Sequence, residues 1–133
     1  MENYKILPHP SDVRFQAFGG TKEELFLNAM LGMNEILKPT ILKKSVKRRI
    51  VVNSYDSNAL LVDFLSEVLY LSQVNKEIYT DVNFDRFSDK ELGGELIGNK
   101  VESFGEDIKG VTYHDLKIEQ KNGLFEATIL FDI

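Results

Sequence analysis

The sequence predicts a single α+β domain, a two-layer structure in which a mostly antiparallel sheet carries two helices on one face. Three observations predict it: two capped segments with helical apolar spacing, several segments rich in β-formers, and one Asn-Gly turn. The 133 residues fit one domain over 1–133. A chain of this length buries roughly two-thirds of its unfolded surface, so it folds without a disulfide or metal staple.

The first half of the chain predicts a strand and a helix in direct succession. Residues alternate between apolar and polar over Asp12–Phe18, and two glycines follow. Thr21 and Glu24 then form a capping box, which predicts a helix running to about Leu37. A second strand is expected at Val46–Asn53, where apolar and basic residues alternate.

A second helix is predicted at Asn58–Val74, capped by Asp56 or Ser57, with a broad apolar stripe. Asp63 and Glu67 stand one turn apart on its remaining face. They are either a solvated polar stripe or a patch that presents carboxylates to a basic partner.

The second half of the chain predicts strands and one hairpin. Asn122-Gly123 is a type I′ turn signal, because both residues tolerate positive φ. The expected strands are Ile78–Phe87, Glu91–Ile97, Gly110–Gln120 and Leu124–Asp132. The turn sets a register, whose pairs are Ile118 with Ala127, Leu116 with Ile129, His114 with Phe131, and Tyr113 with Asp132.

Composition excludes several function classes. The chain has no cysteine, which excludes thiolate zinc sites, cysteine nucleophiles and disulfides. It lacks a signal peptide and an apolar run long enough for a membrane helix, so we expect a cytoplasmic protein with no membrane partner. The net charge is −5, and the one basic cluster is Lys43, Lys44, Lys47, Arg48 and Arg49. We interpret this cluster as a solvated loop and strand face, so if the protein works in RNA metabolism we expect it to bind a protein and to contact RNA only indirectly.

The last two residues, Asp132 and Ile133, directly follow a strong strand signal. A terminus paired in a sheet places a side-chain carboxylate and the main-chain carboxylate close together, where they repel unless a cation lies between them. Oxygen ligands of this kind favour Ca²⁺, Mg²⁺ or Mn²⁺. The alternative is that Asp132 is an ordinary solvated end residue.

Two further segments carry candidate residues. His9 and Asp12 flank the entry to the first long strand, where His9 is a general base, a ligand or a loop histidine bonded to backbone. Asp12 alone is equally typical of an Asx turn. Lys109 and His114 are candidates in the penultimate strand, although the predicted register favours a core role for His114. No nucleophile–base pair, phosphate loop or zinc-protease motif is marked out in the sequence, although the two histidines and the many carboxylates allow acid–base chemistry.

The order and spacing of five segments resemble the archease family along nearly the whole chain. They are Tyr4…His9-Pro10-Ser11-Asp12-Val13…Ala17-Phe18-Gly19, Thr21…Glu23-Glu24-Leu25-Phe26…Asn28-Ala29, residues 60–71, residues 109–118, and Leu130-Phe131-Asp132-Ile133. The sequence departs from the family pattern at Pro10-Ser11, where Thr-Ala is usual, and in its middle.

The resemblance implies a function that composition does not. Archease-like proteins are cofactors of the RtcB-type tRNA-splicing RNA ligase and promote its guanylylation and multiple turnover. The resemblance also implies a divalent ion, typically Ca²⁺, on Asp12, Asp132 and the main-chain oxygens of Ile133. His9, Asp63, Glu67, Lys109 and His114 match other family positions, as accessory or partner-binding residues.

Two alternatives stay open beside that expectation. One is a chaperone-like adaptor for another RNA-modifying enzyme, such as a tRNA methyltransferase, and the other is a small metal-dependent hydrolase. The sequence fixes neither the metal nor the oligomeric state.

Overall fold

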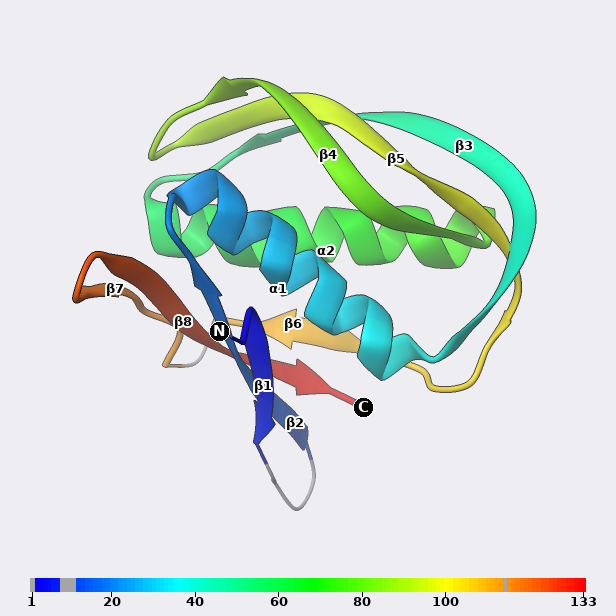
Figure 1. The fold of residues 1–133 in the computed structure, drawn as a ribbon, viewed down its shortest axis with the longest axis horizontal. Helices are drawn as coiled ribbons and strands as arrows, with labels where there is room; N and C mark the ends of the chain where they lie inside the picture. Colours follow the sequence, from blue (N-terminus) through cyan, green and yellow to red (C-terminus); the bar gives the residue numbers. More distant parts are fainter. Residues whose placement is uncertain (1, 8–11, 114) are drawn as a thin grey trace.

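A computed structural model describes residues 2–7, 12–113 and 115–133 of the chain (Figure 1). Two helices and eight strands follow one another along it. In chain order they are β1 (Tyr4–Leu7), β2 (Asp12–Gly19), α1 (Lys22–Leu37), β3 (Pro39–Asn53), α2 (Ser57–Asn75), β4 (Glu77–Phe87), β5 (Glu91–Phe104), β6 (Gly110–Thr112), β7 (Ile118–Lys121) and β8 (Leu124–Asp132).

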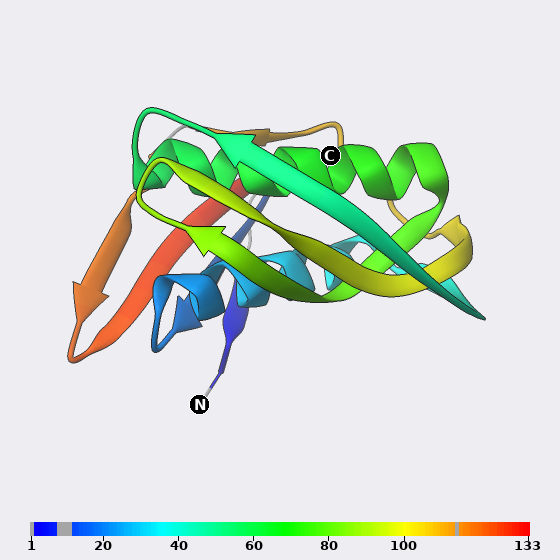
Figure 2. The same ribbon diagram turned by 90° about the horizontal axis from the view of Figure 1, so that it is seen from above.

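The strands form two sheets, and all their ladders are antiparallel. One sheet has the order β1-β2-β8-β6, with β7 also paired to β8, and the other has the order β3-β5-β4. Both helices contact both sheets, and the long strands β3 to β5 curve over them (Figures 1 and 2). The α+β class is therefore confirmed, whereas the single sheet of the prediction is two sheets. Alternation in a sequence shows which face of a strand is buried, but it does not show which strands pair.

The helices begin where their caps predict. The Thr21 hydroxyl accepts a hydrogen bond from the Glu24 amide at 3.1 Å, and the Glu24 carboxylate accepts one from the Gly20 amide at 3.2 Å. Asp56, rather than Ser57, caps α2 by accepting from the Ala59 amide at 2.8 Å. In the described residues, no helix has the length and apolar character needed to cross a membrane.

Several strands differ from the prediction. β3 and β5 are longer than predicted, and the short β1 was not predicted. The extra residues of β3 include exposed threonine and lysine side chains around 40–45, which carry no alternating apolar signal. The predicted strand at Gly110–Gln120 is instead two strands, β6 and β7, separated by residues 113–117.

The predicted hairpin register is confirmed close to the turn and is wrong farther from it. Ile118 pairs with Ala127, as predicted. Residues 113 and 115–117 then lie outside the ladder, with Asp115 at a φ of 56°. The predicted pairs Leu116–Ile129, His114–Phe131 and Tyr113–Asp132 are replaced by Gly110–Asp132, Val111–Phe131 and Thr112–Leu130. Compared with a continuous ladder, the pairing beyond the break is shifted by three residues. His114 lies outside the described residues.

A buried carboxylate joins the three strands of the smaller sheet. Glu77 on β4 is fully buried and accepts two hydrogen bonds from the Arg48 guanidinium, at 2.8 and 2.9 Å. Lys100 on β5 lies 3.0 Å from it, and the Tyr79 hydroxyl donates to it at 2.7 Å. The hydrogen bonds from Arg48 are the main cause that lowers the pKa of Glu77, to about 2.

The basic cluster is in part explained by this sheet. Arg48 pairs with Glu77, Arg49 with Asp85, and Lys47 lies 3.9 Å from Glu95. Three of its five cations therefore have carboxylate partners on the other two strands of the same sheet, which fits a charged strand face better than a nucleic-acid site.

Candidate functional site

The two aspartates singled out from sequence lie side by side. Asp12 begins β2, Asp132 ends β8, and their Cα atoms are direct partners in the antiparallel ladder. Directly opposed residues in such a ladder share one face, with Cβ atoms about 4.5–5.5 Å apart. The fold therefore brings together two carboxylates that are remote in sequence. Two like charges at this separation repel each other unless a cation or a proton intervenes.

The end of β8 is held on both sides. Asp132 pairs with Gly110 of β6 as well as with Asp12 of β2, and its carbonyl oxygen accepts a hydrogen bond from the Lys109 amide at 2.6 Å. Phe131 is fully buried, and Ile133 packs against the core. These contacts oppose the fraying that is usual at the end of a strand, so the main-chain oxygens of Ile133 stay close to Asp132.

Side chains alone do not complete a metal site at this edge. In the part of the chain that the structure describes, no group of three or more His, Cys, Asp or Glu residues could hold a metal ion. Asp12 and Asp132 supply two carboxylates at this edge, and the main-chain oxygens of Ile133 follow directly after Asp132. Such an all-oxygen set suits Ca²⁺, Mg²⁺ or Mn²⁺.

The remaining predicted site residues fall into two groups. Asp63 and Glu67 lie on the outward face of α2, and Lys109 immediately precedes β6, which packs beside α2. His9 and His114 lie outside the described residues.

Asp63 connects α2 to Tyr113, the residue that follows β6. The Tyr113 hydroxyl donates to one oxygen of the Asp63 carboxylate, and the Ser54 hydroxyl donates to the other at 2.5 Å. The hydrogen bond to Asp63, with smaller effects of burial and nearby charge, raises the pKa of Tyr113 to about 12. Sequence reasoning missed Ser54 and placed Tyr113 opposite Asp132, because nothing in the sequence marked the break in the strand.

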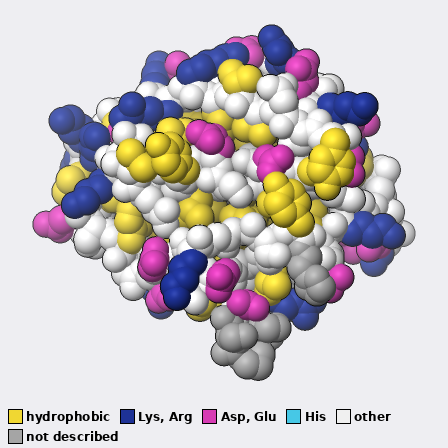
Figure 3. Space-filling view, turned by 180° about the vertical axis from the view of Figure 1, so that it is seen from behind, with side chains coloured by type: hydrophobic (Ala, Val, Ile, Leu, Met, Phe, Trp, Pro, Cys, Tyr) yellow, Lys and Arg dark blue, Asp and Glu magenta, His cyan; other side chains and the backbone are white. Residues whose placement is uncertain are grey.

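A hollow lies between α2 and the start of β6. Its volume is about 310 Å³. The residues that line it are Ser66, Leu69, Tyr70, Gln73, Lys109, Gly110 and Val111. Gly110 also pairs with Asp132, so the hollow lies one strand away from the two aspartates. Figure 3, which views the molecule from behind, shows acidic side chains between groups of hydrophobic ones on one face.

Comparison with known proteins matches this chain along its length. Residues 4–133 match the model of the archease protein family. The chain is 33% identical to protein archease of Methanosarcina barkeri, over 99% of this chain and 97% of that one. It is 29% identical to protein archease of Methanothermobacter thermautotrophicus, with both chains covered completely.

Two solved structures share the fold. The solution structure of Methanobacterium thermoautotrophicum protein 1598 aligns over 100% of both chains, with a TM-score of 0.81 and 28% identity. The crystal structure of a Thermotoga maritima archease, described as a possible chaperone, aligns over 96% of this chain and 94% of that one, with a TM-score of 0.68 and 20% identity. The family model spans nearly the whole chain and the curated relatives cover it end to end, and so the chain belongs to the archease family.

Proposed function

We propose that this chain is a metal-binding protein cofactor that activates an RtcB-type RNA ligase in tRNA splicing or RNA repair, and that it is not itself an enzyme. The observation that carries the proposal is the pairing of Asp12 with Asp132 at the end of β8. Membership of the archease family supports the general role of a helper protein.

The chemistry of the edge supports a hard divalent cation. The Asp12 and Asp132 carboxylates and the main-chain oxygens of Ile133 would hold it, and Ca²⁺ suits them best because it accepts six to eight oxygens in flexible geometry. When bound, the cation neutralises the repulsion between the two aspartates. Three protein ligands leave coordination positions for water or for an oxygen of the partner.

The protein residues act here by binding and positioning. The β2–β8 ladder fixes Asp12 beside Asp132, and β6 supports Asp132 from its other side. Asp132 is exposed, so this edge can meet a partner surface. We propose that the edge is presented at the ligase active site and there promotes guanylylation and multiple turnover.

A guanylylation assay tests the proposal. The Asp12→Ala variant should lose stimulation of ligase guanylylation and of multiple-turnover ligation, while its circular dichroism spectrum stays that of wild type. Glu102→Ala, which removes an exposed carboxylate on β5, serves as the matched control and should stimulate normally. Full stimulation by Asp12→Ala would rule this site out.

A second candidate function is a metal-free, chaperone-like adaptor for another RNA-modifying enzyme. It is favoured by the lack of a three-residue metal cluster in the described residues, and the Thermotoga maritima relative is described as a possible chaperone. Exhaustive chelation discriminates the two. Partner affinity and stimulation that persist without metal would support the adaptor, whereas their loss and recovery on adding Ca²⁺ would support the cofactor.

A further inference from the structure

We infer that the outward face of α2, together with the neighbouring Tyr113, docks a basic, arginine-bearing segment of a protein partner. We call it the α2 face and define it by Tyr55, Asp63, Glu67, Tyr70 and Tyr113. The inference rests on the proposed function, because the α2 face would bind the partner on which the proposed metal site acts. We call that site, Asp12, Asp132 and Ile133, the metal edge.

The α2 face holds an unusual share of the exposed apolar surface. Tyr55 is 75% exposed, Tyr70 57% and Tyr113 55%. Val74, one turn beyond Tyr70 on α2, is 60% exposed. Of the eight large hydrophobic side chains exposed in the described residues, four therefore lie on α2 or beside it. Clustered exposure of this kind marks interaction surfaces, whereas single exposed residues do not.

The two carboxylates and two of the exposed apolar side chains lie along one line of α2. Asp63, Glu67, Tyr70 and Val74 follow at helical spacings of three and four, so they share a face of α2. Tyr113 bonds Asp63 at one end, and Tyr55 lies near enough to raise the pKa of Tyr113.

The carboxylates on this face have no cationic partners among the described residues. Asp63 accepts hydrogen bonds only from the neutral hydroxyls of Ser54 and Tyr113. Glu67 is half-buried and takes part in no side-chain hydrogen bond or ion pair within the described ranges. Both negative charges are thus available to an incoming cation. Lys109 lines the same hollow as Tyr70, and no ion pair joins it to Asp63 or Glu67 within the described ranges.

An arginine side chain fits this pattern better than other cations or nucleic acid. Its guanidinium stacks on aromatic rings and pairs with carboxylates in the same contact, which an ammonium group does less well. The phosphates of RNA would instead meet Asp63 and Glu67, and like charges repel. The Tyr113 ring is already fixed by its hydrogen bond to Asp63, so little conformational entropy is lost on docking.

The position of the face connects it to the metal edge. The hollow beside Tyr70 reaches Gly110, and Gly110 pairs with Asp132. A partner segment lying along α2 would therefore bring the rest of the partner against Asp12 and Asp132.

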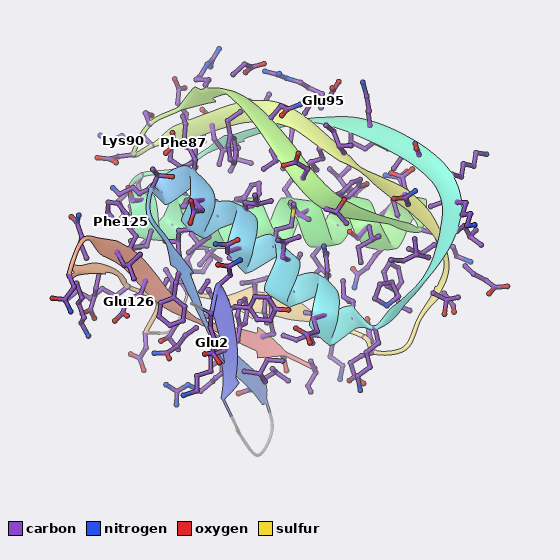
Figure 4. The ribbon with its side chains drawn as sticks, viewed as in Figure 1. Glu2, Phe87, Lys90, Glu95, Phe125 and Glu126 are labelled. Carbon is purple, nitrogen blue, oxygen red and sulfur yellow. The ribbon has the colours of Figure 1, made fainter. Side chains whose placement is uncertain are left out.

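Binding to a purified RtcB-type RNA ligase tests the inference with the full chain. Tyr70→Ala and Glu67→Gln should each weaken binding about tenfold or more, as central interface residues do. Val51→Ala and Glu95→Gln are matched controls on the outer side of the three-stranded sheet, where Figure 4 labels Glu95, and both should bind like wild type. Unchanged binding by both α2 variants would overturn the inference.

The same set of variants separates this inference from the proposed function. Calcium affinity should be unchanged in Tyr70→Ala and Glu67→Gln, because neither residue belongs to the metal edge. If Asp12→Ala stimulates guanylylation fully while Tyr70→Ala loses ligase binding, the metal proposal fails and the docking surface stands.

A second measurement applies even if wild-type protein does not bind the ligase. The ¹⁵N-labelled protein is titrated with a ten-residue arginine-rich peptide and separately with a twelve-nucleotide single-stranded RNA. The peptide should shift the amide signals of Tyr55, Glu67, Tyr70 and Tyr113, and Glu67→Gln should reduce those shifts. Shifts confined to other surfaces, no shifts at all, or stronger shifts at this face with the RNA would each overturn the inference.

Discussion

Asp12 and Asp132 are direct partners across β2 and β8, although 119 other residues separate them in the chain. Opposed like charges in an antiparallel ladder destabilise it by roughly 0.2–1 kcal/mol. A single amide in place of either carboxylate would remove this repulsion. Such an arrangement is expected where the pair has a ligand to bind.

The first prediction concerns this pair. In EDTA, Asp12→Asn should raise the free energy of unfolding by about 0.5 kcal/mol, because it removes the repulsion with Asp132. In Ca²⁺ the order should reverse, since only wild type gains binding energy, about 2.7 kcal/mol at one hundred times the dissociation constant. Urea denaturation in the two buffers measures both. An Asp12→Asn protein that Ca²⁺ stabilises as much as wild type contradicts the prediction.

The second prediction concerns the buried carboxylate of Glu77 and the pH dependence of stability. Its pKa in the folded protein is about 2, below its ordinary value of 4.5. A lowered folded pKa adds stability that is complete above 4.5 and is lost as the pH falls from 4.5 toward 2. We expect a loss of about 2 kcal/mol across that range, after allowing for screening at Arg48, whose side chain is 39% exposed.

Denaturation curves between pH 7 and pH 2.5 check this prediction. Glu77→Gln should be less stable than wild type at pH 7, because it leaves Arg48 and Lys100 without their buried counter-charge. It should also lose less stability on acidification. An identical acid dependence in wild type and Glu77→Gln would show that another carboxyl group is responsible.

The third prediction concerns the hydrogen bond from Tyr113 to Asp63. The pKa of Tyr113 is raised to about 12 in the folded protein, so the bond stabilises the fold fully below pH 10 and is lost as the pH rises from 10 to 12. Asp63→Asn should move the Tyr113 pKa back toward 10. Because the tyrosine is exposed, the loss of stability at pH 7 should not exceed about 1 kcal/mol.

NMR titration of ring-labelled tyrosine measures that pKa directly. Tyr4 provides an internal control, since its own pKa, raised to about 12 by Glu35, should not respond to Asp63→Asn. A Tyr113 pKa that stays near 12 in Asp63→Asn would be incompatible with the hydrogen bond described.

The fourth prediction compares two glycines. A Cβ at Gly98 on β5 would overlap the Ile78 carbonyl oxygen on β4, so Gly98→Ala should destabilise the protein by about 3 kcal/mol. A Cβ at Gly110 meets nothing within 4 Å, so Gly110→Ala should leave stability within about 0.5 kcal/mol of wild type. Thermal denaturation of both variants checks the pair. Equal stabilities would contradict the close approach of β4 and β5.

The sequence predicts local structure well where local chemistry decides it. Thr21 and Asp56 mark the helix starts because a capping side chain contacts its own backbone three residues on. The Asn122-Gly123 turn fixes the pairing of Ile118 with Ala127 for the same reason. Residues far apart in the chain are harder to place, so the division into two sheets was not predicted.

The candidate site was predicted in part. Asp12 and Asp132 were selected from family resemblance and from their strand positions, and the β2–β8 ladder places them together. The predicted register that pairs Tyr113 with Asp132 is wrong, because Gly110 takes that place and Tyr113 lies outside the ladder, hydrogen-bonded to Asp63 on α2. No local feature of the sequence indicates that the strand is interrupted after Thr112, since Tyr113 and its neighbours are compatible with a continuous strand.

The most direct test of the account is the electron density between the two aspartates in crystals grown with Ca²⁺. The account predicts one strong peak with the Asp12 carboxylate, the Asp132 carboxylate and a main-chain oxygen of Ile133 at about 2.3–2.6 Å from it. A peak no stronger than a water molecule at saturating Ca²⁺, or an ion bound elsewhere on the protein, would contradict it.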